Sequence, residues 1–385
     1  MKIITDTDSL HKFCQKASSA PFIAVDTEFM RERTFYSILA LIQIATPDDE
    51  AIIDPLAKGL DMTPFLELLL DEKITKVLHS SRQDYEIFYQ MCGEVPKPLF
   101  DTQIAAMALG YGESIGYLAL VKGELGIKLD KGQRFTDWMK RPLSDKQLSY
   151  ALADVTHLRD LYPGLVRKLK QKGRTDLVKE EMQALYDETL YNFDPDLVWR
   201  RLKPKSRHTA YLAVMKAVAA WREKQAKARN IPRNRVFKDD VIYQIAQRRP
   251  RSLKDLSALR GIPPGLHKQK NVDRLIKAIG HACDNADKLA PVIPKPVNMP
   301  AGLGPATEML KTLLRIRAEN EGIAPRIVAS NAELEKIAAF GEDADVKTLK
   351  GWRRKLFGEE ALKMREGKLS LRLIGKDVVV EAVKS

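Results

Sequence analysis

The sequence predicts an α/β domain with a mixed sheet of five or six strands flanked by helices, followed by two smaller all-α domains. Up to about residue 170, short apolar runs alternate with amphipathic patterns of helical period. Beyond residue 208 the apolar spacing is helical and punctuated by glycine and proline, with no strand pattern. A chain of 385 residues is long enough to bury a core in each of these domains.

The α/β part begins with strands joined by short connections, which predicts an antiparallel start to the sheet. The later alternation of strand and helix predicts parallel additions. We expect strands near residues 21–27, 38–45, 50–54 and 75–79, and helices near 61–71, 82–91, 102–109, 115–125 and 144–170.

The first strand, FIAVDTEF, carries two acids near its end. Asp26 and Glu28 are two residues apart, and side chains at that spacing lie on the same face of a strand. They can therefore face one cation. The alternative is a pair of solvated acids at a strand end.

The second motif lies in KVLHSSRQDYEIF, where Val77 and Leu78 close a strand. Ser80 or Ser81 can cap the following helix, so Asp84 falls near its first turn. Asp84 alone could be an ordinary helix-start acid that the helix dipole favours.

The third motif lies on the helix predicted for SDKQLSYALADVTHLRDLYPGL. Ser144 is a plausible N-cap with Gln147 at the capping-box position, and Tyr150 and Asp154 are one turn apart on one face. Such a pair can be simply a half-buried ring and a surface acid. Together with the two earlier motifs, it predicts a site for two divalent metals, which would cleave phosphodiester bonds.

These three motifs in order resemble the DEDD 3′→5′ exonucleases of the ribonuclease-H-like superfamily, in the subgroup with tyrosine before the last acid. The flanking segments IQIAT, FDTQIAAMALGY and FTDWMKRPLSDKQLSYALADV are similar to the bacterial ribonuclease D family. The resemblance covers most of the chain and shows no departure at the five motif positions. It implies a ribonuclease-H-like fold and a metal-dependent exoribonuclease with two Mg²⁺ or Mn²⁺ ions. Such an enzyme releases nucleoside 5′-monophosphates from the 3′ ends of tRNA precursors and other structured RNAs.

The resemblance also assigns roles to the motif residues. Asp26 would bridge the two ions, Glu28 and Asp154 would complete the ion that holds the attacking water, and Asp84 would support the second ion. Without metal, converging carboxylates raise one another's pKa. A tyrosine with an ordinary pKa of about 10 is a poor base, so Tyr150 would orient the water.

Phe29 and Met30 follow the first motif immediately. They could wedge against the terminal base of an RNA. An ordinary core role for Phe29 is the alternative.

Charge is unevenly distributed along the chain, whose net charge is +13. Residues 1–200 hold 25 Lys and Arg against 31 Asp and Glu, whereas residues 201–290 hold 22 against 7 and residues 301–385 hold 16 against 13. The middle segment therefore has the excess of positive charge expected of a surface that binds a polyanion. The alternative is a basic surface that is simply solvated. The predicted RNA contacts there are Arg222, Arg229, Arg233, Arg235 and Lys238.

A degenerate repeat with a shift of 92 residues links the two helical stretches. AAWREKQAKARNIPRNRVFKDDVIYQIA matches KTLLRIRAENEGIAPRIVASNAELEKIA, which aligns Trp221 with Leu313 and Val236 with Val328. Both stretches resemble HRDC domains, the helical modules shared by RecQ-type helicases and ribonuclease D. The expected organisation is an exonuclease domain at 1–171, a connector at 172–207, a basic HRDC-like domain at 208–290, a linker at 291–305 and a second HRDC-like domain at 306–385.

Cys14, Cys92 and Cys283 are widely spaced and form no C-x-x-C pair, which argues against disulfides or a zinc site and predicts a cytoplasmic protein. The chain has no apolar run near 18 residues, and its start does not resemble a signal peptide. We expect a monomer. Two other interpretations stay open at this point, a Werner-type DNA exonuclease and an RNA-binding scaffold with an inactive nuclease fold.

Overall fold

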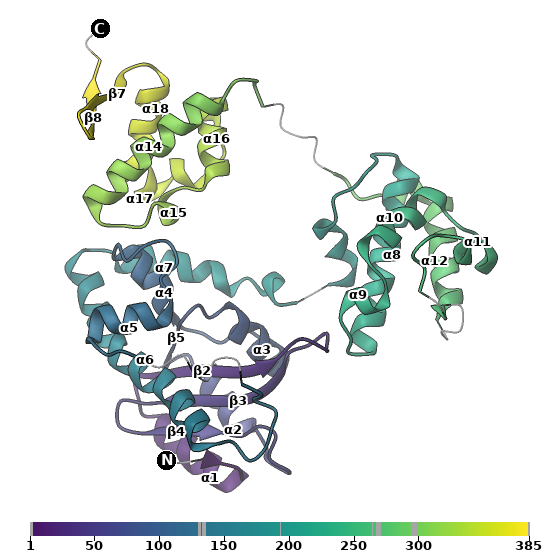
Figure 1. The fold of residues 1–385 in the computed structure, drawn as a ribbon, viewed down its shortest axis with the longest axis horizontal. Helices are drawn as coiled ribbons and strands as arrows, with labels where there is room; N and C mark the ends of the chain where they lie inside the picture. Colours follow the sequence, from purple (N-terminus) through teal and green to yellow (C-terminus); the bar gives the residue numbers. More distant parts are fainter. Residues whose placement is uncertain are drawn as a thin grey trace.

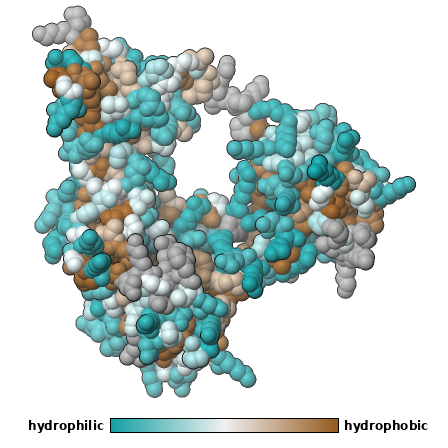
Figure 2. Space-filling view, in the orientation of Figure 1, coloured by the Kyte–Doolittle hydropathy of each residue, from teal (hydrophilic) through white to brown (hydrophobic). Residues whose placement is uncertain are grey.

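The computed structural model describes residues 3–129, 132, 136–192, 194–263, 265–266, 271–293 and 299–383. Figure 1 shows an α/β unit, a first helical unit made of α8 to α13, and a second helical unit that runs from α14 to the C-terminal strands. In the space-filling view these three units surround an opening (Figure 2). The predicted linker at 291–305 includes residues 294–298, which lie outside the described residues.

The α/β unit is built on the mixed sheet that the sequence predicted, with six strands in the order β1-β4-β3-β2-β5-β6. β2 pairs with β3, and β3 with β4, in antiparallel fashion, whereas β2–β5, β5–β6 and β1–β4 are parallel pairs. The sequence did not predict β1 and β6, which are too short to show a pattern. The strands are β1 (Ile3–Ile4), β2 (Phe22–Met30), β3 (Ile38–Ala45), β4 (Glu50–Ile53), β5 (Thr75–Leu78) and β6 (Leu99–Asp101).

Helices cover both faces of this sheet because the strand residues alternate between two cores. Ile23 and Val25 of β2 pack with α1, α2 and α3, whereas Phe22 and Ala24 pack with α4 and α6. The five predicted helices are confirmed to within two residues, and α1 was not predicted. The helices are α1 (Thr7–Ala17), α2 (Thr63–Leu70), α3 (Arg82–Cys92), α4 (Thr102–Ala108), α5 (Tyr117–Leu125), α6 (Asp145–Gln171) and α7 (Thr175–Gln183), followed by 3₁₀ turns at Ala184–Tyr186, Glu188–Leu190 and Pro195–Arg201.

The two helical units share an element pattern. Adding 92 to the bounds of α9 and α10 gives those of α15 and α16, as the sequence repeat predicted. The first unit contains α8 (Thr209–Ala228), α9 (Arg233–Val236), α10 (Asp239–Arg248), α11 (Leu253–Ser257), α12 (Val272–Asp284) and α13 (Ala286–Leu289). The second contains α14 (Gly304–Glu321), α15 (Pro325–Val328), α16 (Asn331–Phe340), 3₁₀ turns at Gly341–Asp343 and Lys347–Leu349, α17 (Gly351–Arg353), a π-helical turn at Arg354–Gly358 and α18 (Glu359–Arg365).

The all-α description of the second unit needs one correction. Its last residues form a hairpin of β7 (Leu369–Ile374) and β8 (Asp377–Ala382). The alternation of apolar and polar residues in LSLRLI has the period of a strand, but it is one short segment at the end of a helical region. The pattern is therefore too weak to predict a hairpin there.

The second helical unit packs tightly against the α/β unit. Ala324 donates its backbone N–H to the carbonyl oxygen of Met107 at 2.9 Å, and the Arg174 guanidinium donates to the carbonyl oxygen of Gly322 at 2.7 Å. At Gly110 a Cβ atom would lie 2.6 Å from the Gly322 carbonyl oxygen, so the two backbones approach as closely as only glycine permits.

The first helical unit contacts the α/β unit through the loop between β2 and β3. Phe35 of that loop is only 7% exposed and packs into the core of the helical unit. The Asn230 side-chain oxygen accepts from the backbone N–H of Phe35 and of Tyr36, both at 3.1 Å. The loop that follows the acid-bearing strand is thus held by the first helical unit.

Candidate active site

The central strand β2 carries the first two acids beyond the end of its parallel neighbour. Ala24 pairs with Val77 of β5, which ends one residue later, so Asp26 and Glu28 extend past it. On the other side they pair with residues of β3, and the register shifts between Glu28 and Phe29. Both acids are half-buried. The carboxyl ends of parallel strands are where open α/β sheets bind ligands.

Asp84 lies in the first turn of α3, as predicted, and is 7% exposed. The Thr27 hydroxyl, between the two acids of β2, donates to Asp84 Oδ1 at 2.5 Å. This bond ties the second motif to the first. Sequence inspection missed Thr27, because nothing in the sequence shows that its side chain turns toward Asp84 of α3.

The turn that delivers Asp84 is held by Asp101, a second residue that sequence inspection missed. Asp101 is buried and accepts the backbone N–H of Ser80 at 3.1 Å and of Ser81 at 2.8 Å. Ser81 precedes α3, but its hydroxyl donates to Asp101 instead of capping the helix. Ser80 adopts φ +58°, a left-handed conformation that these bonds stabilise.

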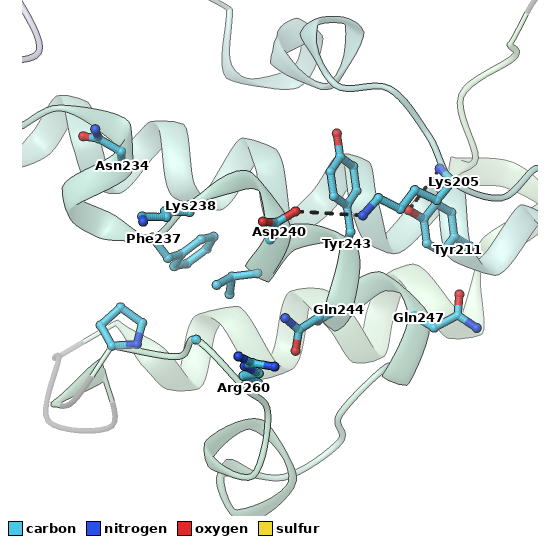
Figure 3. Close-up of a pocket in the computed structure, with 13 residues that line it drawn as sticks. Lys205, Tyr211, Asn234, Phe237, Lys238, Asp240, Tyr243, Gln244, Gln247 and Arg260 are labelled. Atoms are coloured by element: carbon cyan, nitrogen blue, oxygen red, sulfur yellow. Dashed lines mark hydrogen bonds and ion pairs between the residues drawn. The ribbon is translucent and has the colours of Figure 1, made fainter.

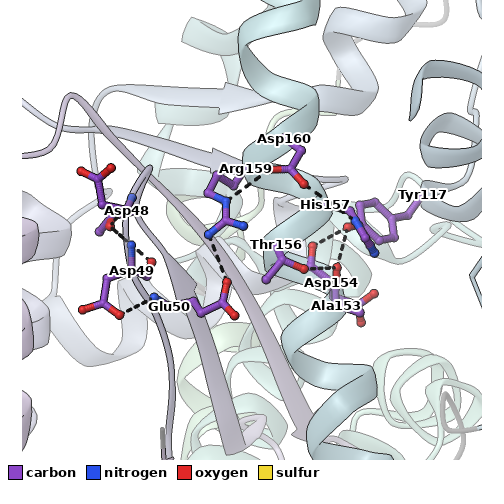
Figure 4. A network of polar contacts seen from close by, with 11 residues as sticks. Asp48, Asp49, Glu50, Tyr117, Ala153, Asp154, Thr156, His157, Arg159 and Asp160 are labelled. Atoms are coloured by element: carbon purple, nitrogen blue, oxygen red, sulfur yellow. Dashed lines mark hydrogen bonds and ion pairs between the residues drawn. The ribbon is translucent and has the colours of Figure 1, made fainter. Parts of the chain in front are cut away.

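Tyr150 and Asp154 lie one turn apart on α6, whose capping box of Ser144 and Gln147 forms as predicted. The Tyr117 hydroxyl donates to the Asp154 carbonyl oxygen at 2.5 Å (Figure 4). Arg159 reaches from the same helix to Glu50 of β4 at 3.0 Å (Figure 4). These bonds fix the acid-bearing part of α6 against α5 and the sheet.

The structure brings all five motif residues to one cleft. One carboxylate oxygen from each of Asp26, Glu28 and Asp154 lies within 4.8 Å of the others. Asp84 and Tyr150 complete the polar wall of this cleft, whose volume is about 660 Å³. Phe29 also lines it, together with Thr27, His79, Ser80, Gln83, Gln103 and Tyr117. Met30, at the end of β2, is not among the described residues that line the cleft.

Burial governs the electrostatics of these acids. It raises the pKa of Asp26 well above its ordinary value, and the charges of Asp154, Asp84 and Glu28 add to the effect. Burial likewise raises the pKa values of Asp84 and Asp154 to about 7 each. Hard divalent cations prefer oxygen ligands of this kind and would offset the repulsion. The donor set therefore fits the divalent metal on which DEDD exonucleases depend.

The residues predicted to contact RNA in the first helical unit fall into two groups. The prediction was wrong for Arg222, which is 7% exposed, pairs with Asp239 at 2.7 Å and donates to the Phe237 carbonyl oxygen. Arg233 is half-buried, paired with Glu223 at 2.5 Å and stacked over Phe35 at the junction with the α/β unit. By contrast, the side chains that remain exposed are Arg229, Arg235 and Lys238.

Comparison with known proteins agrees with this geometry. A family model described as 3′-5′ exonuclease matches residues 1–170, and the HRDC domain model matches residues 211–279. A ribonuclease D from Nitrobacter hamburgensis is 45% identical over 385 residues, covering all of both chains, and one from Zymomonas mobilis is 45% identical over 96% of this chain and 95% of its own.

Among solved structures, the exoribonuclease RNase D of Escherichia coli matches with a TM-score of 0.76 and 30% identity, covering 94% of this chain and 98% of that one. Among the described helices, none combines the length and apolar composition needed to cross a bilayer. With its full-length relatives, its matching domain models and its acidic cleft, the chain belongs to the ribonuclease D family of 3′→5′ exoribonucleases.

Proposed function

We propose that the acidic cleft removes nucleotides one at a time from the 3′ ends of tRNA precursors and other structured RNAs. The released products would be nucleoside 5′-monophosphates. The observation that carries this proposal is the convergence of Asp26, Glu28 and Asp154 within one cleft that Asp84 and Tyr150 also line. The Escherichia coli relative, an exoribonuclease involved in structured RNA processing, supports the choice of substrate.

Asp26, Glu28, Asp84 and Asp154 would hold two divalent ions, Mg²⁺ or Mn²⁺. When bound, such ions lower the pKa of coordinated water and neutralise charge on the scissile phosphate. The charges of Asp154, Asp84 and Glu28 all act on Asp26, which suits Asp26 to a bridging position. The Thr27 hydroxyl donates to Oδ1 of Asp84 and so holds this acid beside the acids of β2.

Tyr150 would orient the attacking water through its hydroxyl. It lies one turn before Asp154 on α6, with its ring 6.2 Å from that of Trp138. Attack on the last phosphodiester forms a new P–O bond to the water oxygen and breaks the bond to the 3′-oxygen of the penultimate nucleotide. A proton goes to that oxygen, which leaves a new 3′-hydroxyl. Phe29, at the wall of the cleft, would pack against the terminal base.

We also propose the domain boundaries given above, with the exonuclease domain at 1–171 and HRDC-like domains at 208–290 and 306–385. One observation refines them. Leu177 and Val178 of α7 are buried in the core shared with α4 and α6, so the connector contributes to the α/β unit.

We propose that the protein is located in the cytoplasm and is a monomer. The free cysteines agree with a reducing compartment.

Digestion of a tRNA precursor tests this function. A 5′-labelled precursor with a short 3′ extension should shorten stepwise in the presence of Mg²⁺, release 5′-monophosphates and persist in chelator. Unchanged RNA in Mg²⁺ would favour an inactive scaffold. Faster digestion of a matched single-stranded DNA than of the RNA would favour a DNA exonuclease.

A further inference from the structure

A second cavity, of about 830 Å³, lies in the first helical unit (Figure 3). Its floor consists of buried Tyr211, Phe237 and Val241. Its exposed rim carries positive side chains from three separate segments, Lys205 before α8, Lys238 before α10 and Arg260 beyond α11. We call this cavity the α10 groove.

The positive charge of the α10 groove is only partly neutralised. No acid of the described chain lies within 4.0 Å of the charged atoms of Lys238 or Arg260, and Lys205 approaches Asp240 only at 3.9 Å. Asp240 is the one acid among the described lining residues. The segment 201–290 around the groove has 22 basic against 7 acidic residues. The rim is therefore a set of cations to which phosphates would be drawn.

The same groove carries an aromatic ring and two amides from one helix. The Tyr243 ring is half-buried beneath Lys205 Nζ at 4.7 Å, and its hydroxyl accepts from the backbone N–H of Lys203 at 3.1 Å, which fixes the ring. Gln244 and Gln247 of α10 line the groove and make no hydrogen bond within the described residues. In Figure 3 Gln244 lies on the side of the groove that faces Arg260.

We propose that the α10 groove binds an unpaired segment of the RNA substrate. Cations follow the phosphates, an aromatic face stacks a base, and free amides bond to base edges, which is how proteins recognise single-stranded nucleic acid. Lys205 would move from the Tyr243 ring to a phosphate and leave the ring to a base. A duplex offers the groove only its backbone, so the ring and amides would have no partner. The inference rests on the proposed function, since it assigns the groove to the same substrate.

Binding of a short unstructured RNA to the full chain tests this inference. The probe is a fluorescent oligoadenylate of about twelve nucleotides, with chelator present so that it is not digested. The variant Lys238→Glu/Arg260→Glu should raise its Kd at least about tenfold, because repulsion replaces the attraction of two cations for phosphates. Tyr243→Leu should raise it about five- to tenfold, because a stacked base would have no aromatic partner. A blunt RNA duplex should bind the Tyr243→Leu chain as it binds the wild type.

The matched control is Lys254→Glu/Lys277→Glu, which makes the same charge change at exposed residues of the same unit outside the groove. Its Kd should stay within about threefold of the wild type, as expected for distant charges screened by salt. Hydrolysis of a trinucleotide should be unchanged in this control variant. Equal losses of affinity in the groove and control variants would overturn the inference, as would an equal loss of duplex binding in Tyr243→Leu. Failure of the wild type to hydrolyse any RNA would instead reject the proposed function.

Discussion

At the residue scale, the acids of the cleft are placed where they cost stability. Asp26, Asp84 and Asp154 are packed in one cleft, and burial raises the pKa of each. Proteins retain such like-charged buried groups mainly at functional sites. The Thr27 hydroxyl bonds to Asp84, and Asp101 holds the turn that precedes Asp84. These hydrogen bonds keep the acids together even though the acids repel one another.

Replacing one acid by its amide should separate activity from stability. Asp154→Asn or Asp26→Asn should lower the rate of RNA hydrolysis at least about 10³-fold, because each removes a charged ligand of a catalytic metal. The metal-free variant should be at least as stable as the wild type near pH 8, because a neutral amide replaces a buried carboxylate. Single-turnover kinetics and thermal melting measure the two effects.

The control for this pair is Asp160→Asn, an exposed acid on the same helix as Asp154. Its rate should match the wild type. Wild-type turnover in purified Asp154→Asn or Asp26→Asn would remove those residues from the site.

Metal binding should depend on pH through Asp84 and Asp154. Their pKa values are raised to about 7 in the folded chain, so without metal the fold gains stability from bound protons at acidic pH. That gain is complete below the unfolded pKa of about 4 and is lost as the pH rises through about 7. The melting temperature of the metal-free chain should therefore fall over this range, and the increase caused by Mn²⁺ should be larger at about pH 8 than at about pH 5.5. An equal Mn²⁺ effect at both pH values would contradict the role of these acids.

Tyr150→Phe should keep metal binding and slow the chemical step about 10- to 10³-fold, through loss of the hydroxyl that orients the water. Calorimetric Mn²⁺ titration and single-turnover rates measure the two effects separately. Unchanged rates would show that the ring only packs between Trp138 and Asp154.

At the element scale, the sequence predicted those elements whose pattern is local. The apolar run before Asp26 and the capping box before Tyr150 placed both motifs within their strand and helix. By contrast, Thr27, Asp101 and Tyr117 act through contacts between segments distant in sequence, and no local pattern encodes these. Strands of two or three residues, such as Ile3–Ile4, were not predicted for a related reason. Pairing with a neighbouring strand defines them, and their own sequence is too short to show a pattern.

The loop between β2 and β3 should hold the first helical unit in place. The change Phe35→Ala/Asn230→Gly removes the buried ring and the oxygen that accepts two backbone N–H groups. The ring alone contributes about 3–5 kcal/mol to packing, so the helical unit should detach and the radius of gyration from small-angle X-ray scattering should increase.

Asn230→Asp is the matched control, because it keeps the accepting oxygen at a residue with φ +45° that asparagine and aspartate tolerate. Its scattering curve should match that of the wild type. An unchanged radius in the double variant would show that other contacts hold the unit.

At the scale of the whole molecule, positive charge and the acidic cleft belong to different units. The second helical unit packs its own core onto the α/β unit and is nearly neutral in charge. Deleting it would expose that core, so surface charge changes are the better probe of RNA affinity.

The salt dependence of RNA binding should be set by the first helical unit. Neutralising Arg229, Arg235 and Lys238 to glutamine should flatten the slope of log K against log salt by about 0.7–0.9 for each phosphate that no longer meets a cation. The matched change in the second helical unit, at the exposed residues Lys336, Lys355 and Lys363, should leave the slope unchanged. Filter binding across a salt series measures both slopes. Equal flattening would show that charge asymmetry does not mark the RNA-binding surface.

Diffraction from a crystal soaked in Mn²⁺ and a nucleoside 5′-monophosphate, collected at a wavelength where manganese scatters anomalously, tests the four-carboxylate metal site most directly. We predict two anomalous peaks in the cleft, one ligated by Asp26, Glu28 and Asp154 and the other by Asp26 with Asp84 nearby. The same soak of an Asp154→Asn crystal should lose the first peak. Manganese bound elsewhere with the cleft empty would contradict the assignment of these acids as the catalytic metal site.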